Sequence, residues 1–403
     1  MENNAVGIDV SKGRSMVCIL RPYGEMVAAP FEVRHTNSEI DDLIKQIREL
    51  DGETKIVMES TGRYQLPLLE KLTDANLSVS LINAKLIKDY QYENTFRRVK
   101  SDKADSKKIS AYILDKWTQL KKYGAMDKVR DQLKTINRQF DFYIQQKVNL
   151  QNNVVSLMDL TFPGVNNLFS SPVKTDGHCK WLDFAYTYWH ADCVCKKSLH
   201  AFSEHYHNWC RKNNYNYGTD KAKEIYHVSS ELVPVLPKDD STKKLIYQSI
   251  DMLYAMTATV ESLRKQLDEA ASQLPEYPVV MDMKGVGHTL GPQLMSEIGD
   301  VTRFSKRSAI TAYAGVDPGV NESGDYYQKS VHASKHGSPE LRKTLFQIME
   351  VLNIHAPEDD PVYSFMVKKK AEGKKYYVYM TAAANKFLRI YYGKVKAYLK
   401  AQK

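Results

Sequence analysis

The first third of the chain alternates short apolar runs with amphipathic stretches. Three runs rich in β-branched residues, separated by the tight turns "SKGR" and "RPYG", predict an antiparallel meander: "NAVGIDV", "SMVCIL" and "EMVAAPFEVRHT". A helix "IDDLIKQIREL" follows, which Asn37 and Ser38 can cap. After it the pattern predicts, in order, a buried strand "TKIVMES", a helix "YQLPLLEKLTDA", a strand "LSVSLIN" and a helix "AKLIKDYQYE". The order β-β-β-α-β-α-β-α predicts an α/β domain of the ribonuclease-H-like type, a mixed sheet with helices on its faces.

From about Val129 the apolar period becomes helical. Apolar residues recur in alternating steps of three and four between Val129 and Leu157, with Lys147 as the one break, and again between Leu253 and Leu274. This pattern predicts an α-helical middle of two long helices with a coiled-coil seam. Pairing of the helices with each other and pairing with a second subunit both fit the pattern.

An insert, roughly residues 161–240, separates the two helical runs. It is rich in Trp, Tyr and His and holds four of the five cysteines, Cys179, Cys193, Cys195 and Cys210. These residue types would suit a zinc site, but "CVC" followed by scattered histidines is not a recognised tetrahedral spacing. A helical accessory domain with aromatic side chains in its core is the favoured interpretation.

The last third opens with "MKGVGHTLGPQLMSEIGD", in which Gly285 and Gly287 bracket a tight turn before a helix. The stretch resembles a helix-hairpin-helix element, in which backbone N–H groups hold a DNA phosphate. A glycine turn without a ligand fits the same spacing. The remainder predicts a mainly α-helical domain with glycine-rich turns.

Composition narrows the class of protein. The chain has 403 residues, enough for two or three domains. No apolar run reaches the length of a membrane span and the N-terminus lacks a basic region followed by an apolar one, so we expect no membrane association and a cytoplasmic location. Five cysteines do not suggest a disulfide framework. The net charge of +9 favours polyanions such as nucleic acids as partners.

Four acidic residues stand out by their places in the predicted elements. Asp9 ends the first strand, in "GIDVSK", and Glu59 ends the fourth, in "VMESTG". The two strands are neighbours and parallel in a ribonuclease-H-like sheet, so the two carboxylates would meet at one edge. Asp102 and Asp105, in "KSDKADSKK", are three residues apart and therefore share one face of a later helix, which could close over the strand ends.

Four converging carboxylates repel one another, and divalent cations relieve that repulsion. Hard oxygen ligands suit Mg²⁺ or Mn²⁺, and a pair of such ions supports phosphoryl transfer. Taken singly, each acid is ordinarily a turn, cap or surface residue, so only the joint order points to a metal site. The flanking basic residues fit a phosphate backbone or a solvated surface and receive no site role: Arg97, Arg98, Lys100, Lys103, Lys107 and Lys108.

These motifs resemble a known family. "GIDVSK", "MESTG" and "KSDKADS", followed by "GVGHTLGPQLMSEIGDVTRFSKRSAITAYAGVDPGVNESG" and "KHGSPELRKTL", are similar in order and separation to the DEDD transposases of the IS110 insertion sequences. The resemblance covers roughly residues 5–118 and 278–395. It implies four parts: a RuvC-like catalytic domain (1–118), coiled-coil helices (119–160 and 241–275), a helical insert (161–240) and a C-terminal transposase domain (276–403).

The resemblance also implies a function. Members recombine donor and target DNA under the direction of a bridge RNA, and we would expect a homo-oligomer, dimer or tetramer, associated with the bacterial nucleoid. The family's metal-binding quartet maps onto the four acidic residues named above, Asp9, Glu59, Asp102 and Asp105, with Mg²⁺ or Mn²⁺ as the cofactor.

The family also uses a catalytic serine, which maps onto Ser323 in "AGVDPGVNESG". Val316, Asp317 and Glu322 depart from the family's usual residues there. A serine hydroxyl needs activation before it can attack a phosphate, and the ordinary explanation of Ser-Gly is a turn. Three later basic residues fit contacts to phosphate or RNA and fit a solvated surface nearly as well: Lys335, Arg342 and Lys343.

Three other functions fit parts of the sequence. A RuvC-like, metal-dependent Holliday-junction resolvase or nuclease would need the carboxylates but not Ser323. An actin-like kinase is disfavoured, because "GIDVSKG" carries Val10 where those enzymes carry Gly. A non-catalytic RNA-binding scaffold would bind RNA and cleave no DNA.

Overall fold

The computed structural model of the chain describes residues 3–60, 62–84, 86–88, 90, 101–120, 122–123, 128–174, 177–318, 322–323, 326–327 and 333–402. The chain divides into two compact units, an N-terminal unit Met1–Ala125 and a C-terminal unit Met126–Lys403. Half of the expected helix "AKLIKDYQYE" lies outside the described residues, as do Arg97, Arg98 and Lys100.

The N-terminal unit contains a mixed five-stranded sheet. Its strands are β1 (Asn3–Ser11), β2 (Arg14–Leu20), β3 (Met26–Arg34), β4 (Glu53–Ser60) and β5 (Val79–Asn83), in the order β3-β2-β1-β4-β5. The first three pair antiparallel, whereas β1 pairs parallel with β4 and β4 parallel with β5. The predicted meander and the predicted pairing of the first and fourth strands are confirmed.

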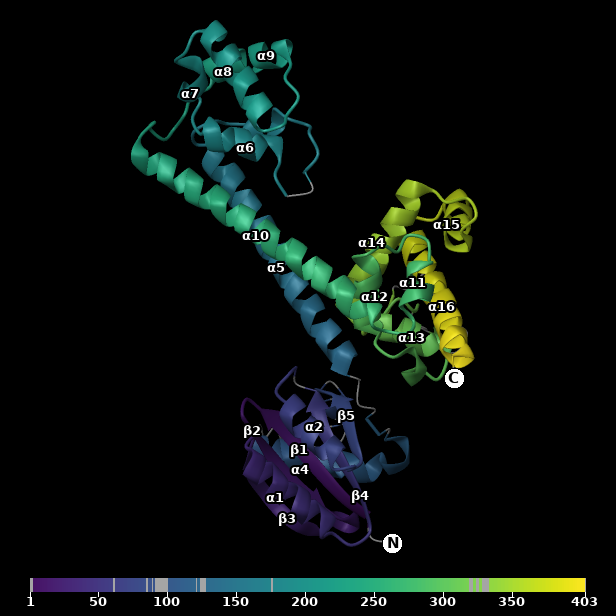
Figure 1. Cartoon of the computed structure of the whole chain (residues 1–403). Coiled ribbons are helices and arrows are strands. Elements are labelled where there is room, and N and C mark those ends of the chain that lie inside the picture. Colours follow the sequence, from purple (N-terminus) through teal and green to yellow (C-terminus); the bar gives the residue numbers. More distant parts are fainter. Residues whose placement is uncertain are drawn as a thin grey trace. The chain divides into compact units, whose positions relative to one another are not determined.

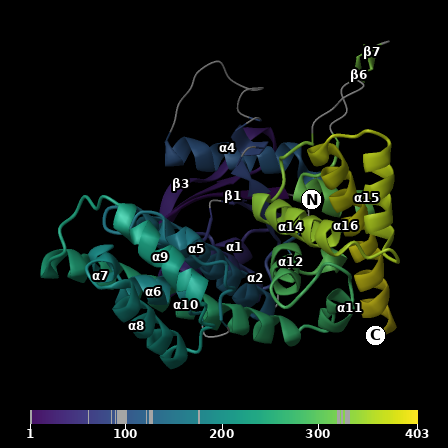
Figure 2. The same ribbon diagram turned by 90° about the horizontal axis from the view of Figure 1, so that it is seen from above.

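Both faces of this sheet carry helices, as Figure 2 shows. α1 (Asn37–Arg48) and α2 (Leu66–Asp74) pack against Val6, Ile8 and the other alternate residues on one face. α4 (Asp102–Asp115) packs on the opposite face, where Ala5 and Val57 contact Ile109 and Ile113. The period-two alternation of β1 therefore decides which of its residues face α4.

The cap of α1 differs from the prediction. Thr36, in extended conformation, is the N-cap, and its side chain accepts a hydrogen bond from the Glu39 N–H at 3.5 Å. Asn37 and Ser38 are already helical, so their side chains cannot take that role.

The C-terminal unit is mainly helical in its described residues. It holds α5 (Lys128–Met158), α6 (Lys180–Thr187), α7 (Asp192–Cys195), α8 (Leu199–Lys212), α9 (Thr219–Glu231), α10 (Asp240–Ser272), α11 (Tyr277–Met281), α12 (Leu290–Ile298), α13 (Arg307–Ala314), α14 (Pro339–His355), α15 (Pro361–Ala371) and α16 (Tyr376–Ala401), with two short strands, β6 (Glu322–Ser323) and β7 (Tyr326–Tyr327). Within the described ranges every helix is too short or too polar to cross a membrane.

α5 and α10 lie side by side in opposite directions (Figure 1). At one end Leu133 and Leu267 join the core of the C-terminal helices, and at the other Val154 and Ile250 join the core of the insert. Polar contacts fix the first of these junctions. Arg138 on α5 pairs with Glu297 on α12 at 3.0 Å and with Glu340 on α14 at 2.7 Å.

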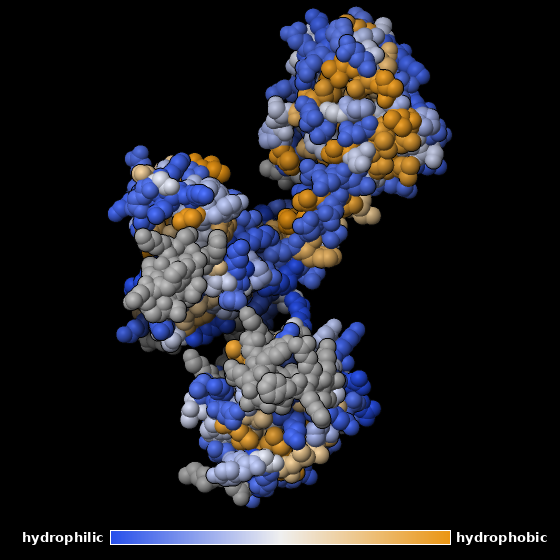
Figure 3. All heavy atoms as spheres, turned by 180° about the vertical axis from the view of Figure 1, so that it is seen from behind, coloured by the Kyte–Doolittle hydropathy of each residue, from blue (hydrophilic) through white to orange (hydrophobic). Residues whose placement is uncertain are grey.

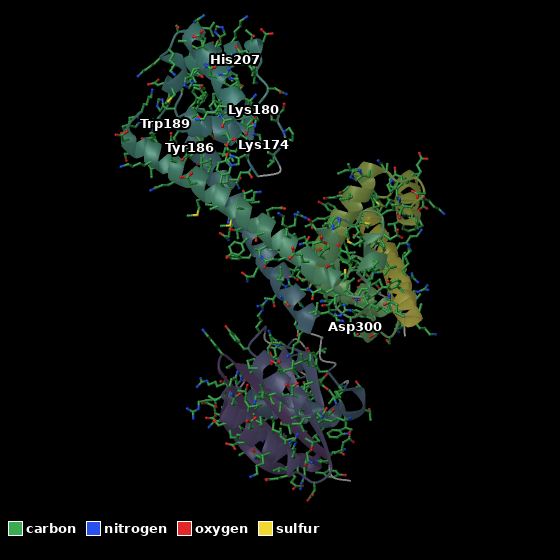
Figure 4. All side chains as sticks on the ribbon, viewed as in Figure 1. Lys174, Lys180, Tyr186, Trp189, His207 and Asp300 are labelled. Carbon is green, nitrogen blue, oxygen red and sulfur yellow. The ribbon has the colours of Figure 1, made fainter. Side chains whose placement is uncertain are left out.

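The insert, α6 to α9, is built around aromatic side chains. The ring of Phe184 lies 4.5–6.0 Å from those of Tyr188, Tyr206 and Trp209. Lys180, marked in Figure 4, is only 7% exposed, and its ammonium donates to the Asn216 carbonyl at 2.7 Å. Among the described residues no three His, Cys, Asp or Glu side chains are placed to hold a metal ion. In its described residues the insert is thus helical with an aromatic core.

Candidate active site

Asp9 and Glu59 lie at the same edge and on the same face of the sheet. β1 and β4 are paired in parallel register up to Ile8 and Met58, and the two acids are the next residues. Each follows a residue of the α4-covered face by two positions, Gly7 in β1 and Val57 in β4. Both carboxylates therefore stand on the α4 face, half-buried, where the two strands end.

α4 supplies the other two acids from its first turn. The helix starts at Ser101, whose hydroxyl accepts from the Ala104 N–H at 3.2 Å. Asp102 and Asp105 follow at the helix N-terminus, where unpaired backbone N–H groups favour negative charge. The Asp105 carboxylate also pairs with the Lys108 ammonium at 2.8 Å.

Gly7 and Ser110 hold α4 unusually close to the sheet. The Gly7 N–H donates to the Ser110 hydroxyl at 3.0 Å, and that hydroxyl lies 2.8 Å from the Cys18 carbonyl oxygen. A Cβ on Gly7 would lie 2.4 Å from the Ser110 nitrogen and 2.5 Å from the Ser106 carbonyl oxygen. We did not single out either residue from the sequence, although a glycine inside a strand commonly marks such a close approach.

The other three acids all act electrostatically on Asp9. The pKa of Asp9 is raised from 3.8 to about 6, chiefly by burial, and then by the charges of Glu59, Asp102 and Asp105. The pKa of Glu59 is also raised, by burial and then by Asp105. Glu59, Asp102 and Asp105 therefore all lie near enough to Asp9 to affect its pKa.

The donor set of this cluster suits a divalent metal ion. Carboxylate oxygens are hard ligands, and a cation would offset both the burial and the like charges that raise the pKa of Asp9. Within the described ranges no three of these acids are close enough to hold an ion as they stand. To ligate one, the side chains would have to draw together, and Asp105, whose Oδ1 accepts from Lys108, would still have Oδ2 for the ion.

Ser323 belongs to the C-terminal unit. It pairs with Tyr326 in the antiparallel contact between β6 and β7, and its side chain lies outside the described residues. Pro318 and Ala333 form a bridge on either side of this segment, and the Ser334 hydroxyl donates to the Asp317 carboxylate at 2.7 Å.

Two of the three basic residues that follow Ser323 in the sequence are engaged within the fold. The Arg342 guanidinium donates to the carbonyls of Ala314 at 3.0 Å and Gly337 at 3.2 Å. The Lys343 ammonium pairs with Asp141 on α5 at 2.8 Å. Both side chains therefore have a structural role that the sequence did not suggest.

Comparison with known proteins identifies the family. A family model described as "Transposase", that of the IS110 DEDD transposases, matches residues 6–163, which include the four clustered acids. A second, described as "Transposase IS116/IS110/IS902 family", matches residues 277–364, which include Ser323. The search of curated proteins found no match. With an N-terminal DEDD domain and a C-terminal transposase domain, the chain belongs to the IS110 family of transposases, enzymes of DNA phosphoryl transfer.

Proposed function

We propose that this transposase cleaves, exchanges and rejoins donor and target DNA, with Asp9, Glu59, Asp102 and Asp105 holding Mg²⁺ or Mn²⁺ and Ser323 as nucleophile. The observation that carries the proposal is the placement of the acids: Asp9 and Glu59 follow the paired ends of β1 and β4 on the face covered by α4, whose first turn holds Asp102 and Asp105. The strand order with helices on both faces supports a ribonuclease-H-like, RuvC-like N-terminal domain.

The chemistry divides between the two units. Divalent ions supply charge stabilisation at the phosphate when they are bound. The Ser323 hydroxyl oxygen bonds to phosphorus while the bond from phosphorus to the leaving deoxyribose oxygen breaks. A base from the N-terminal unit of the same or another subunit accepts the serine proton, and the leaving oxygen is protonated. The phosphoserine ester conserves the bond energy for rejoining.

The proposed partners are donor DNA, target DNA, a bridge RNA and further copies of the chain, in the cytoplasm beside the nucleoid. The α5–α10 pair, proposed as a coiled coil, supports assembly because Phe142, Val148 and Met252 are about half exposed on its surface. Figure 3 shows apolar side chains among the hydrophilic ones along this pair. We also propose the four-part division, with boundaries near residues 118, 160, 240 and 275, as the functional one.

Trapping the covalent intermediate tests the nucleophile. Labelled donor DNA is incubated with the protein and Mg²⁺, and the mixture is denatured and run on a gel. We expect label on the wild-type protein and none on Ser323→Ala or Asp9→Asn, whereas the control Ser364→Ala, an exposed serine of α15, retains it. Cleavage by Ser323→Ala at the wild-type rate would instead support the water-using resolvase.

Cleavage assays with and without added RNA test whether a bridge RNA guides the protein. RNA transcribed from the non-coding DNA beside the gene is supplied to the purified protein, with an RNA of scrambled loops as the control. We expect cleavage at the donor site only with the matched RNA. Equal cleavage without RNA would remove guidance from the proposal and leave the metal site intact.

A further inference from the structure

The positive charge of the chain is concentrated at its C-terminal end. Residues 361–403, which span α15 and α16, contain eleven Lys and Arg but a single acid, Glu372, a net charge of +10. The whole chain has a net charge of +9, so the other 360 residues together are close to neutral. The excess of positive charge in the chain therefore lies in this segment.

The turn between α15 and α16 is the most exposed part of this basic region. Every residue from 370 to 378 is exposed. We call Lys368–Val378 the tip; it contains five lysines: Lys368, Lys369, Lys370, Lys374 and Lys375. Among the described residues only Lys369 has an ion-pair partner, Glu372 at 2.7 Å, so four ammonium groups are available to a ligand.

Aromatic and apolar side chains lie among these lysines. Tyr377 is 73% exposed, Val378 53% and Tyr376 40%. The ring of Tyr377 lies 5.2 Å from that of Tyr376 and 6.4 Å from that of Phe346 on α14, so it is supported on one side. Glu350 of α14 is the acid that interacts with Tyr376.

Lysines beside an exposed tyrosine favour unpaired nucleic acid over a duplex. Lysines alone suit the phosphates of a duplex, whose bases are stacked on one another and present only their edges. An exposed tyrosine beside lysines suits unpaired bases, which stack on aromatic rings while the ammonium groups contact the backbone. The chain is a DNA transposase, and strand exchange releases unpaired DNA.

We propose that the tip Lys368–Val378 binds unpaired DNA strands, with Tyr377 as a stacking platform and Lys368, Lys370, Lys374 and Lys375 as phosphate contacts. The surface lies outside the acidic cluster and does not involve Ser323. The proposal rests on the transposase activity of the chain, not on the proposed nucleophile or guide RNA.

Binding of labelled oligonucleotides to the full-length protein tests the proposal. Fluorescence anisotropy is measured with single-stranded DNA, duplex DNA and single-stranded RNA of one sequence, across a salt series. We expect Tyr377→Ala to weaken single-stranded DNA binding by about 5- to 150-fold and to leave duplex binding unchanged, and Tyr377→Phe to restore it. Lys374→Ala with Lys375→Ala should reduce the salt slope for single strands by about 1.4.

Matched control variants remove a tyrosine or two lysines from the surface outside the tip. Tyr23, fully exposed in the turn between β2 and β3, controls for the loss of a surface tyrosine, and Lys212 with Lys244 controls for the loss of two exposed lysines. Circular dichroism melting checks that each variant is folded. Equal losses on duplex and single strand in Tyr377→Ala, a tighter and Tyr377-dependent affinity for RNA, or no loss with any oligonucleotide would each overturn the proposal.

Discussion

A methyl group on Gly7 should separate the two halves of the acidic cluster. In Gly7→Ala the new Cβ would lie 2.4 Å from the backbone nitrogen of Ser110, whereas ordinary contacts begin near 3.4 Å. Backbone cannot rotate away as a side chain can, so α4 must move from β1 by about 1 Å. Overpacking of this kind costs about 1–3 kcal/mol. The same movement carries Asp102 and Asp105 away from Asp9 and Glu59.

The loss of metal-dependent activity should therefore exceed the loss of stability. We expect weaker Mn²⁺ binding and at least about a 10²-fold slower cleavage, since an error of 1 Å in catalytic geometry has effects of this size. Calorimetric titration with Mn²⁺, DNA cleavage and thermal melting are measured on one preparation.

Gly393→Ala is the matched control for this substitution. Gly393 lies inside α16 with open space around its Cβ position, so alanine there should stabilise the helix slightly and leave the cleavage rate unchanged. Wild-type Mn²⁺ affinity and cleavage in Gly7→Ala would refute the argument that this contact sets the spacing of the acids.

Three further results are expected. Without metal, the unfolding free energy of wild type should fall relative to that of Asp9→Asn as pH rises from about 4 to 6. The pKa of Asp9 is about 6 in the folded protein and 3.8 as its ordinary value, so between these pH values folded Asp9 keeps a proton that the unfolded chain has released. Urea titrations in EDTA measure the difference, and a rise instead of a fall would contradict this reasoning. Glu59→Gln should lower the pKa of Asp9 yet leave it above 3.8, because burial is the larger cause, and carboxyl NMR titration measures it. Arg130→Ala should cost about 3–5 kcal/mol in chemical denaturation because Glu276, 1% exposed, loses its partner, and Arg130→Met with Glu276→Leu should recover most of that; a loss below about 1 kcal/mol would show that the pair is dispensable.

The N-terminal unit was largely readable from sequence because its signals are local. The apolar alternation of β1 and the continuous apolar run of β4 depend on residues next to one another in the chain, and so does the capped first turn of α4. Once the strand order is known, the parallel pairing of β1 with β4 puts Asp9 beside Glu59 without further information.

The contacts that fix the finer geometry were not readable, because they join distant residues. The Ser110 hydroxyl bonds to Gly7 and Cys18, 103 and 92 residues away. Arg342 looked like a candidate phosphate contact, but two backbone carbonyls take its donors, and nothing in the local pattern indicates this. Sequence shows residue types and spacing, whereas such contacts depend on packing between elements.

Because α5 and α10 lie side by side, the number of residues in them sets the distance between the core of the insert and the core of the C-terminal helices. α5 has 31 residues and is therefore about 46 Å long at about 1.5 Å per residue, and about 38 Å of that length separates Leu133 in one core from Met158 in the other. Removing seven residues from each helix would draw the insert in by about 10 Å and turn it by only about 20°. Removing five would turn it by about 140°. The length of the two helices thus sets both the distance of the insert and its rotation, and a change of a whole heptad alters the distance while nearly preserving the rotation.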